Sequence, residues 1–451
     1  MKQSFFGTDG IRGAYGSEYI NDSFAYSLGE SVAQWLSTKE ETSHVVVVGR
    51  DTRLSGENLS HALIAGLDAG GVKVENLGVV PTPLLARSLL SPRYSLGIMI
   101  TASHNPASDN GFKCLGVGGK KLSTQDEVSL SETLKTFLKE KKSSVASEPT
   151  KTASSYVADL KKEYFLSLKS IIPSGLKGWK ICVDTANGAS CETTPEVLKQ
   201  LGAEVIARGN TPTGLNINLD CGSEYPKHVM RDVVANQAQL GIAHDGDGDR
   251  CILCDENGEQ LNGDEILAIL GTDLLSRGEL LSKTLIATVH SNLGLDQAIK
   301  NAGGEVVRTP VGDRHVSEAM KRLGSNLGGE SSGHIITPRI SPTGDGASAA
   351  LHVISVMQRT GKKLSELRKV MQRYPQAYIA LSVKEKKSIQ ELKNLQQKIA
   401  EVEASLAGKG IVLVRYSGTE MKLRLMVQAH DLKTAEGSLS QLVEAAKKDL
   451  N

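Results

Sequence analysis

Runs of β-branched residues alternate with stretches of helical periodicity along most of the chain, in the order strand, helix, strand. The first such unit, residues 44–78, opens with HVVVVGR, crosses a polar turn into an apolar-periodic helix and ends in KVENLG. Residues 179–209 and 284–312 repeat this order. In each unit a residue with a side-chain oxygen precedes the helix and glycine follows it, as helix caps require. Such units form right-handed parallel crossovers, so the pattern predicts α/β sheets covered by helices.

The C-terminal region has a different order of elements. After RYPQAY (373–378) the pattern predicts a strand, IALSV, a charged helix over about 387–406, two strands, GIVLVRYS and KLRLMVQA, and a closing helix. This order is typical of a smaller α+β unit. The polar stretch 141–155, KKSSVASEPTKTASS, is typical of a linker. We therefore expect three similar α/β domains with mixed, mainly parallel sheets and a smaller C-terminal α+β domain, over residues 1–150, 151–253, 254–370 and 371–451.

The composition is that of an ordinary globular protein. The 451 residues are 39% hydrophobic and 23% charged, and 52 basic against 51 acidic residues leave a net charge of +1. This balance and the 4% aromatic content argue against nucleic acid or an acidic membrane as a partner. The N-terminus lacks a signal-peptide pattern and no apolar run is long enough to span a membrane, so a cytoplasmic protein is expected.

Six cysteines are scattered through the second quarter and the middle of the chain, and only Cys251 and Cys254 lie close together. In a long cytoplasmic chain they are expected to be reduced. The CILC stretch has the CxxC spacing of redox and zinc sites, but a single pair is a weak signal and its apolar character favours a buried strand.

The stretch HDGDGDR, residues 244–250, places three carboxylates directly after a predicted strand, LGIA. Crowded like charges raise one another's pKa unless a cation compensates them, and oxygen ligands favour Mg²⁺. An exposed acidic turn is the plain alternative. An EF-hand calcium loop is rejected, because Arg250 occupies the position that must be glycine and strands flank the loop, although Glu256 falls at position 12. The candidate ligands are Asp245, Asp247 and Asp249.

Ser103 follows another predicted strand, GIMI (97–100), in the stretch TASHNPASDNGFK. The tip of a strand, where the chain turns toward solvent, is a position typical of a nucleophile. The flanking glycines of a hydrolase elbow, Gly-x-Ser-x-Gly, do not surround this serine, so a serine hydrolase is not supported.

A third polar stretch, GGESSGH (328–334), offers a carboxylate, a hydroxyl and an imidazole on a glycine-rich scaffold. Glu330, Ser332 and His334 suit the paired donors and acceptors of sugar hydroxyls. Taken alone, the stretch is equally consistent with an ordinary polar loop.

The fourth stretch is RYSGTE (415–420). Arg415, two hydroxyls at Ser417 and Thr419, and the Gly418 amide have the composition of a phosphate nest, with the guanidinium supplying a bidentate contact. A Ser-Gly turn between two strands is also a common hairpin, so this stretch alone does not decide between the two.

Together these four stretches resemble the α-D-phosphohexomutase superfamily, whose members carry a TASHNP serine loop, a DGDGDR metal loop, a GE-x-SGH sugar loop and an R-x-SGTE phosphate loop. They occur here in that order, one in each expected domain, and the resemblance covers the whole chain. It implies four domains around a central cleft. FGTDGIRG (6–13) and TPVGDRHV (309–316) resemble the members that act on glucosamine phosphates more than those that act on mannose or glucose phosphates.

The resemblance implies a mutase that interconverts glucosamine 6-phosphate and glucosamine 1-phosphate and so supplies UDP-N-acetylglucosamine synthesis. Ser103 would carry the phosphoryl group, and one Mg²⁺ per chain would be bound by Ser103 and the three aspartates. Glucosamine 1,6-bisphosphate would be the intermediate and activator. The small-molecule sugar phosphate is thus the expected partner, and a homodimer is left open.

By the same resemblance, each functional position is carried over onto a residue of this chain. The expected catalytic residues are Ser103, Lys113, Arg12 and His104. The expected substrate-binding residues are Arg250, Thr309, Asp313, Glu330, Ser332, His334, Arg415, Ser417, Gly418, Thr419 and Arg424. Three positions depart from the family pattern in the sugar and phosphate loops, namely Ser331, Tyr416 and Met421.

Two other readings have weaker support. A phosphomannomutase or phosphoglucomutase of the same superfamily would share all four loops, since sugar preference depends on a few hydrogen bonds. A non-catalytic sugar-phosphate binding protein would tolerate loss of the serine or of an aspartate, and neither has been lost here.

Overall fold

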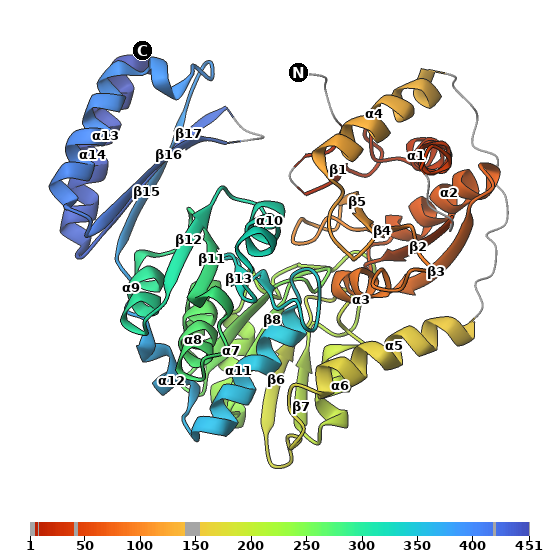
Figure 1. The fold of residues 1–451 in the computed structure, drawn as a ribbon, viewed down its shortest axis with the longest axis horizontal. Coiled ribbons are helices and arrows are strands. Elements are labelled where there is room, and N and C mark those ends of the chain that lie inside the picture. Colours follow the sequence, from red (N-terminus) through yellow and green to blue (C-terminus); the bar gives the residue numbers. More distant parts are fainter. Residues whose placement is uncertain (1–4, 8, 40–43, 140–153, 418–420, 451) are drawn as a thin grey trace.

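The structure is a computed structural model that describes residues 5–7, 9–39, 44–139, 154–417 and 421–450. Four units follow one another along the chain (Figure 1). The first unit, red to orange, and the last, blue, stand on opposite sides of the two central units. The four-domain α/β architecture expected from the sequence is therefore present.

The first domain is a sheet whose described strands run in the order β1-β5-β4-β2-β3. β2, β3 and β4 pair in parallel, whereas β5 and β1 extend the sheet antiparallel. The four consecutive valines of β2 are the β-branched run of a central parallel strand that is buried on both faces. The elements are β1 (Ile11–Ala14), α1 (Asp22–Ser37), β2 (Val45–Arg50), α2 (Ser55–Ala69), β3 (Lys73–Val79), α3 (Thr82–Ser88), β4 (Leu96–Ile100), β5 (Asp109–Gly116) and α4 (Thr124–Lys139).

The second domain repeats this topology, with described strands in the order β10-β9-β8-β6-β7. β8, β6 and β7 are parallel, and β9 and β10 are antiparallel additions. The sheet continues to Leu261, so the expected boundary at 253/254 cuts β9. The elements are α5 (Ser154–Lys169), β6 (Lys180–Asp184), α6 (Thr194–Gln200), β7 (Glu204–Arg208), α7 (Lys227–Asn236), β8 (Leu240–His244), β9 (Cys251–Asp255) and β10 (Gln260–Leu261).

The third domain has described strands in the order β12-β11-β13-β14, of which the first three are parallel. Its first helix begins with a capping box between Asn262 and Glu265, which satisfies the free amides of the first turn. The elements are α8 (Gly263–Ser276), η1 (Leu281–Lys283), β11 (Thr284–Thr288), α9 (Leu293–Asn301), β12 (Glu305–Thr309), α10 (Asp313–Leu323), β13 (Gly328–Gly329), β14 (Ile335–Ile336), α11 (Gly346–Thr360), α12 (Leu364–Leu367) and η2 (Arg368–Val370).

The fourth domain is smaller, with an antiparallel sheet in the order β15-β17-β16. The charged helix expected over about 387–406 is divided into a short 3₁₀ turn and a helix that begins at Lys393. The elements are β15 (Gln376–Ser382), η3 (Ile389–Glu391), α13 (Lys393–Leu406), β16 (Gly410–Tyr416), β17 (Lys422–Ala429) and α14 (Leu432–Leu450).

The glycines after the three repeated helices have positive φ, at Gly71 (76°), Gly202 (96°) and Gly303 (85°). This is the left-handed stop that the sequence pattern predicted. The expected linker at 141–155 lies outside the described residues up to 153, and its last two residues belong to α5.

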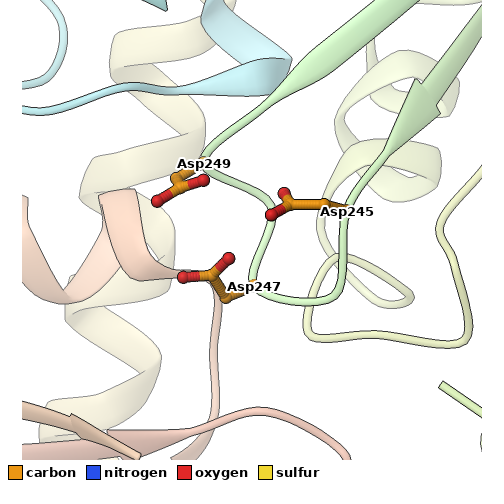
Figure 2. A group of neighbouring side chains, drawn as sticks. All are labelled: Asp245, Asp247 and Asp249. Carbon is orange, nitrogen blue, oxygen red and sulfur yellow. The ribbon is translucent and has the colours of Figure 1, made fainter. Parts of the chain in front are cut away.

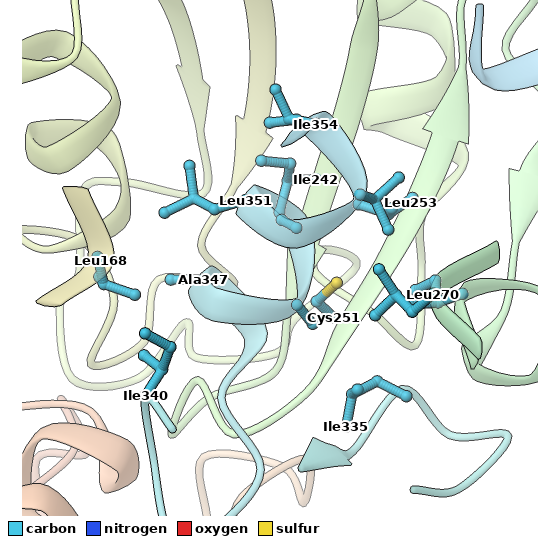
Figure 3. Close-up of a cluster of buried hydrophobic side chains, with 14 of the residues drawn as sticks. Leu168, Ile242, Cys251, Leu253, Leu270, Ile335, Ile340, Ala347, Leu351 and Ile354 are labelled. Atoms are coloured by element: carbon cyan, nitrogen blue, oxygen red, sulfur yellow. The ribbon is translucent and has the colours of Figure 1, made fainter. Parts of the chain in front are cut away.

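One continuous hydrophobic core joins the first three domains. It includes Leu84 of α3, Leu168 of α5 and Leu351 of α11. Figure 3 shows its centre, where α11 lies against Ile242 of β8 and Leu253 of β9. The fourth domain has a separate core around Leu395, Leu423, Leu425, Val427 and Leu442. The first three domains therefore form one packed body, to which the fourth is attached.

Cys251 and Cys254 are both buried in β9, as expected. They belong to separate core clusters, because residues three apart on a strand point to opposite faces of the sheet. This placement excludes a shared metal ion or a disulfide between them. Among the described residues, no helix has both the length and the apolar character needed to cross a membrane.

Candidate active site

Three buried carboxylates converge in the loop between β8 and β9. Ligand oxygens of Asp245, Asp247 and Asp249 all lie within 4.8 Å of one another. Figure 2 shows the three side chains projecting from successive turns of this loop toward a common space. Gly248, at φ 70°, and Gly246 allow the backbone to turn tightly enough for this convergence.

The electrostatics of the three carboxylates differ. Burial raises the pKa of Asp245 well above its usual value, and the charges of Asp247 and Asp249 raise it further. Burial also acts on Asp247, but Lys113 overcomes it and holds the pKa of that carboxyl far below the usual range. The Lys113 Nζ lies 2.5 Å from an Asp247 oxygen and 2.8 Å from an Asp249 oxygen. Arg250 Nε also lies 4.0 Å from an Asp249 oxygen, and these two cations do not prevent the rise in the Asp245 pKa.

Ser103 reaches this cluster from the first domain. It follows β4 in a loop, and its φ of 51° is unusual for a residue other than glycine. Its hydroxyl donates to Asp245 Oδ2 at 2.5 Å. The side chain is almost fully buried, at 1% exposure. The candidate nucleophile and the candidate metal ligands therefore meet across the boundary between two domains.

Beside this cluster lies a pocket of about 250 Å³ to which all four domains contribute. Arg250 of the metal loop, Glu330 and Ser332 of the third domain and Arg415 of the fourth are among its walls. The other lining residues are Asp9, Thr288, His290, Val311, Gly312 and Ser331. Cations, two carboxylates and hydroxyls thus surround a space open to a small polar ligand.

Positive charge is concentrated on the side of this pocket formed by the fourth domain. Arg415 of β16 pairs directly with Arg424 of β17, and His290 lies near both. Burial and the two arginines lower the pKa of His290 to about 4. Like charges side by side on a sheet are unfavourable unless an anion binds between them. This side of the pocket is therefore suited to a phosphate group.

Four domain families match the chain in order: phosphoglucomutase/phosphomannomutase α/β/α domain I over residues 3–141, domain II over 154–258, domain III over 262–374 and the C-terminal domain over 379–445. The chain belongs to the phosphoglucomutase/phosphomannomutase family. Among its relatives, the phosphoglucosamine mutase of Pelobacter propionicus is 42% identical over 450 residues, which is 99% of each chain. The phosphoglucosamine mutase of Myxococcus xanthus is also 42% identical, over 452 residues, covering 100% of this chain and 98% of that protein.

Solved structures share the fold of this chain. A phosphoglucomutase/phosphomannomutase family protein from Burkholderia thailandensis superimposes with a TM-score of 0.79 at 23% identity, covering 100% of this chain and 99% of that one. An N-acetylphosphoglucosamine mutase from Aspergillus fumigatus, solved in complex with GlcNAc-6P and magnesium, gives a TM-score of 0.66 at 17% identity, with coverages of 100% and 96%.

The expected catalytic residues of this phosphohexomutase family member surround Ser103. Lys113 of β5 contacts two of the aspartates, as described above. Arg12 of β1 lies beside the same end of the sheet, opposite Gly111 of β5. Burial, and then the charge of Arg250, lower the pKa of His104. The structure therefore gathers Ser103, Lys113, Arg12 and His104 in one region.

Apart from Arg424 and the phosphate loop, the expected substrate-binding residues divide into two groups. Arg250, Glu330, Ser332 and Arg415 line the pocket, as described above. Three others do not line it: the hydroxyl of Thr309 donates to the Pro310 carbonyl at 3.0 Å, and Asp313 accepts from Lys121 at 2.5 Å. His334 Nε2 lies 3.8 Å from Asp313 and 3.9 Å from Asp249 and makes no hydrogen bond to a described residue.

The phosphate loop is only partly described. Ser417 is buried, and its carbonyl accepts from Lys386 at 2.7 Å, while Gly418 and Thr419 lie outside the described residues. Of the departures from the family pattern, Ser331 lines the pocket and Tyr416 ends β16. Met421 is exposed, and its backbone carbonyl accepts from Val383.

The structure adds site residues that the sequence analysis did not single out. Asp9 and His290 line the pocket. Thr82 of α3 donates through both its backbone amide, at 2.9 Å, and its hydroxyl, at 2.6 Å, to Asp247. Asp9 stands in the GTDGIRG stretch that was noted for Arg12, so that stretch carried a signal for it. Nothing in the sequence distinguishes Thr82 from a helix-capping threonine.

Proposed function

We propose that the chain interconverts glucosamine 6-phosphate and glucosamine 1-phosphate, with Ser103 as the phosphoryl carrier. The contact between the Ser103 hydroxyl and the Asp245 carboxylate, 2.5 Å long, is the observation that carries this proposal. A serine held against three clustered carboxylates suits phosphoryl transfer, whereas acyl transfer would require a base beside the hydroxyl and a set of oxyanion donors. The names of the relatives that match the full chain support the amino-sugar substrate.

The aspartate cluster fits a divalent cation. The Oδ1 atoms of Asp247 and Asp249 are buried and accept no hydrogen bond from any described residue. Carboxylate oxygens are hard ligands, which Mg²⁺ prefers. We therefore propose that Asp245, Asp247, Asp249 and the phosphorylated Ser103 bind one Mg²⁺ per chain. The bound ion would neutralise charge on the transferring phosphoryl group.

In the proposed cycle, the phosphate on the Ser103 oxygen passes to the C1 hydroxyl of glucosamine 6-phosphate. The Ser103 O–P bond breaks, a bond from phosphorus to the sugar oxygen forms, the proton of the sugar hydroxyl ends on the Ser103 oxygen, and glucosamine 1,6-bisphosphate results. The bisphosphate turns around, and its 6-phosphate passes to the Ser103 hydroxyl to leave glucosamine 1-phosphate. Catalysis then rests on position and charge, since the phosphoryl transition state needs little covalent assistance.

Each neighbouring residue has a role consistent with its location. Lys113, and Arg12 near it, provide positive charge at the serine loop. His104 is held close to Arg250, whose charge opposes protonation of the imidazole. The neutral imidazole is thus available as a hydrogen-bond partner for the sugar phosphate.

The pocket residues would bind the sugar in both orientations. Glu330 and Ser332 supply an acceptor and a hydroxyl for the sugar ring, and the Glu330 carboxylate is oriented by the Gly312 amide at 3.1 Å. Arg415 and Arg424, with Ser417, Gly418 and Thr419, would bind the phosphate that does not react. Thr309, Asp313 and His334 would support the pocket walls from behind.

A coupled assay that compares glucosamine 6-phosphate, glucose 1-phosphate and mannose 1-phosphate tests this proposal. We expect the highest kcat/KM with glucosamine 6-phosphate. A higher value with mannose or glucose phosphate would favour the phosphomannomutase or phosphoglucomutase alternative. Binding of all three without turnover would favour a non-catalytic binding protein. A cytoplasmic location, supply of UDP-N-acetylglucosamine synthesis and a homodimer remain predictions.

A further inference from the structure

Arg53 is a fully buried arginine that does not line the pocket and makes no hydrogen bond to Asp245, Asp247 or Asp249 among its described contacts. It follows β2 in the first domain, and its side chain and that of Asp51 are both 0% exposed. Arg53 Nε donates to an Asp51 oxygen at 2.9 Å. A buried ion pair contributes little to stability unless further hydrogen bonds satisfy both partners. The partners of the remaining Arg53 donors therefore indicate which part of the structure Arg53 stabilises.

The other side-chain hydrogen bonds that Arg53 makes to described residues go to backbone carbonyls of the serine loop. One terminal nitrogen donates to the carbonyls of Ser103, at 2.9 Å, and Asn105, at 2.8 Å. The other donates to the carbonyls of Pro106 and Asp109, the latter at 2.9 Å. Only a planar guanidinium presents donors in this fixed arrangement, and a lysine ammonium would lose most of it. Arg53 thus binds the loop at four points.

The same buried pair also supports the Ser103 amide. The Thr101 hydroxyl donates to an Asp51 oxygen at 2.6 Å and accepts the Ser103 N–H at 2.8 Å. The Ser103 backbone is therefore fixed on both its N–H and its carbonyl side. This explains how a serine keeps the unfavourable φ of 51°.

Asn218 binds the loop from the second domain. Its side-chain amide donates to the Ser103 carbonyl at 2.8 Å and to the Asn105 carbonyl at 2.9 Å, the same two carbonyls that Arg53 contacts. A side chain at Gly246 would fill this space, since its Cβ would lie 2.6 Å from the Ser103 carbonyl oxygen and 2.9 Å from the Asn218 amide. The loop is thus held between two domains where the metal loop passes closest.

We propose that Arg53 and Asn218 are positioning residues that set where the Ser103 oxygen lies relative to the aspartate cluster. This inference rests on the proposed function of Ser103 as the phosphoryl carrier. Ser103 and Asp245 belong to different domains, so their 2.5 Å contact depends on how the domains hold the loop between them. A displacement of about 1 Å at a reacting atom can cost roughly 100-fold in rate.

The predicted kinetic signature differs from that of a substrate ligand. Neither Arg53 nor Asn218 lines the pocket that would bind the sugar phosphate. Removing either should therefore lower kcat while KM changes little, because binding of the sugar in the ground state is intact. A purely structural role would instead lower the amount of folded enzyme and leave kcat per folded molecule unchanged.

Asn218→Ala is the primary test, with Asn216→Ala as its matched control. Asn216 lies in the same loop, but among the described residues its side chain bonds only to Thr211 and Thr213 of that loop. We expect Asn218→Ala to lower kcat and the single-turnover rate of phosphoryl transfer by roughly 10- to 100-fold, with KM within about twofold of the wild type. Asn216→Ala should leave kcat within about twofold. Equal kcat values for the two variants would overturn the proposal.

Arg53→Lys and Arg53→Met test the second residue, with Arg368→Met as the control. Arg368 is a salt-bridged arginine that contacts Glu265, Asp255 and the Gln260 carbonyl away from the serine loop. We expect both Arg53 variants to have a lower kcat than the wild type, and Arg53→Lys to recover only a small part of the lost kcat. Arg368→Met should lower Tm and leave kcat unchanged. Full recovery of kcat by lysine would show that charge suffices and would overturn the geometric role.

Amide hydrogen exchange separates this inference from the proposed function. In Asn218→Ala, exchange over residues 101–110 should accelerate relative to the wild type and to Asn216→Ala, whether or not the protein is a mutase. Unchanged exchange in that segment would overturn the proposal. If exchange over residues 101–110 is faster in Asn218→Ala but the wild type has no mutase activity, the proposed function is contradicted and the positioning role of Asn218 is not.

Discussion

Arg415 and Arg424 are directly opposite residues of the antiparallel β16–β17 pair. Their guanidinium groups lie on one face of the sheet, and Arg415 also lines the pocket shared by the four domains. Burial, and then the charge of Arg424, lower the pKa of Arg415. Two cations held together in this way repel each other until an anion binds. In a phosphohexomutase that anion would be the phosphate at the end of the sugar that does not react.

Replacing Arg415 should therefore weaken catalysis through substrate binding. We expect Arg415→Ala to lower kcat/KM by about 2 kcal/mol, or roughly 30-fold, and Arg415→Lys to recover only part, since lysine keeps the charge but loses the bidentate contact. Steady-state kinetics with glucosamine 6-phosphate measure kcat/KM for the wild type and both variants. Arg208→Ala is the control, because Arg208 lies on β7 and pairs with Asp232 of α7. A kcat/KM for Arg415→Ala within about twofold of the wild type would show that Arg415 does not bind phosphate.

Metal binding should stabilise the fold as well as support activity. Three buried carboxylates offer oxygens within 4.8 Å of one another, so a bound divalent cation would relieve their repulsion, and a ligand that binds only the folded state raises Tm. We expect EDTA to abolish activity, Mg²⁺ to restore it, and Mg²⁺ to raise the wild-type Tm. Asp247→Asn should lose orders of magnitude in activity and most of the Mg²⁺-dependent rise in Tm. Full activity after exhaustive chelation would contradict the metal site.

Asp345 provides a test of stability against pH. It caps α11 and accepts from the Tyr164 hydroxyl at 3.1 Å, and burial raises its pKa from 3.8 to about 6. Since the folded-state pKa lies above the unfolded one, the protonated Asp345 carboxyl stabilises the folded state. This stabilisation is complete below about pH 4 and is lost as pH rises through about 6. This difference between the two pKa values corresponds to about 3 kcal/mol in the free energy of unfolding, of which roughly 1 kcal/mol is lost between about pH 5 and pH 7.

Asp345→Asn keeps both hydrogen-bond acceptor roles but removes the titration. We expect the Tm of the wild type to fall relative to that of Asp345→Asn as pH rises from about 5 to about 7. Thermal unfolding of both proteins across this range measures the difference. A Tm difference that does not vary with pH would mean that the pKa of Asp345 is not raised.

The sequence predicted the parts of this molecule whose signals are local. The valine run of β2, the glycine stops after the repeated helices and the Asp-Gly alternation at 245–249 each reflect a constraint on neighbouring residues, and the structure contains the corresponding elements. The charged helix was placed six residues too early, because Ser388 begins a separate 3₁₀ turn before Lys393.

Long-range contacts left no local signal. Arg53 follows β2 in a GRDTR stretch that is compatible with any polar turn, and its four acceptors lie about 50 residues later. Asn218 is one of several asparagines in a loop. The role of such residues depends on which domain surfaces meet, and that is decided by the packing of the whole chain.

Intact-mass measurement during a single turnover shows whether Ser103 carries the phosphoryl group. Active enzyme should carry about one phosphate, located at Ser103 by peptide mapping, and excess glucosamine 6-phosphate should transfer it to the sugar as the 1,6-bisphosphate. Ser103→Ala should fold with an unchanged Tm, carry no phosphate at that loop and turn over no substrate at catalytic bisphosphate levels. A Ser103→Ala enzyme with near-normal rates, or a phosphate that stays on Ser103 throughout turnover, would show that Ser103 is not the phosphoryl carrier.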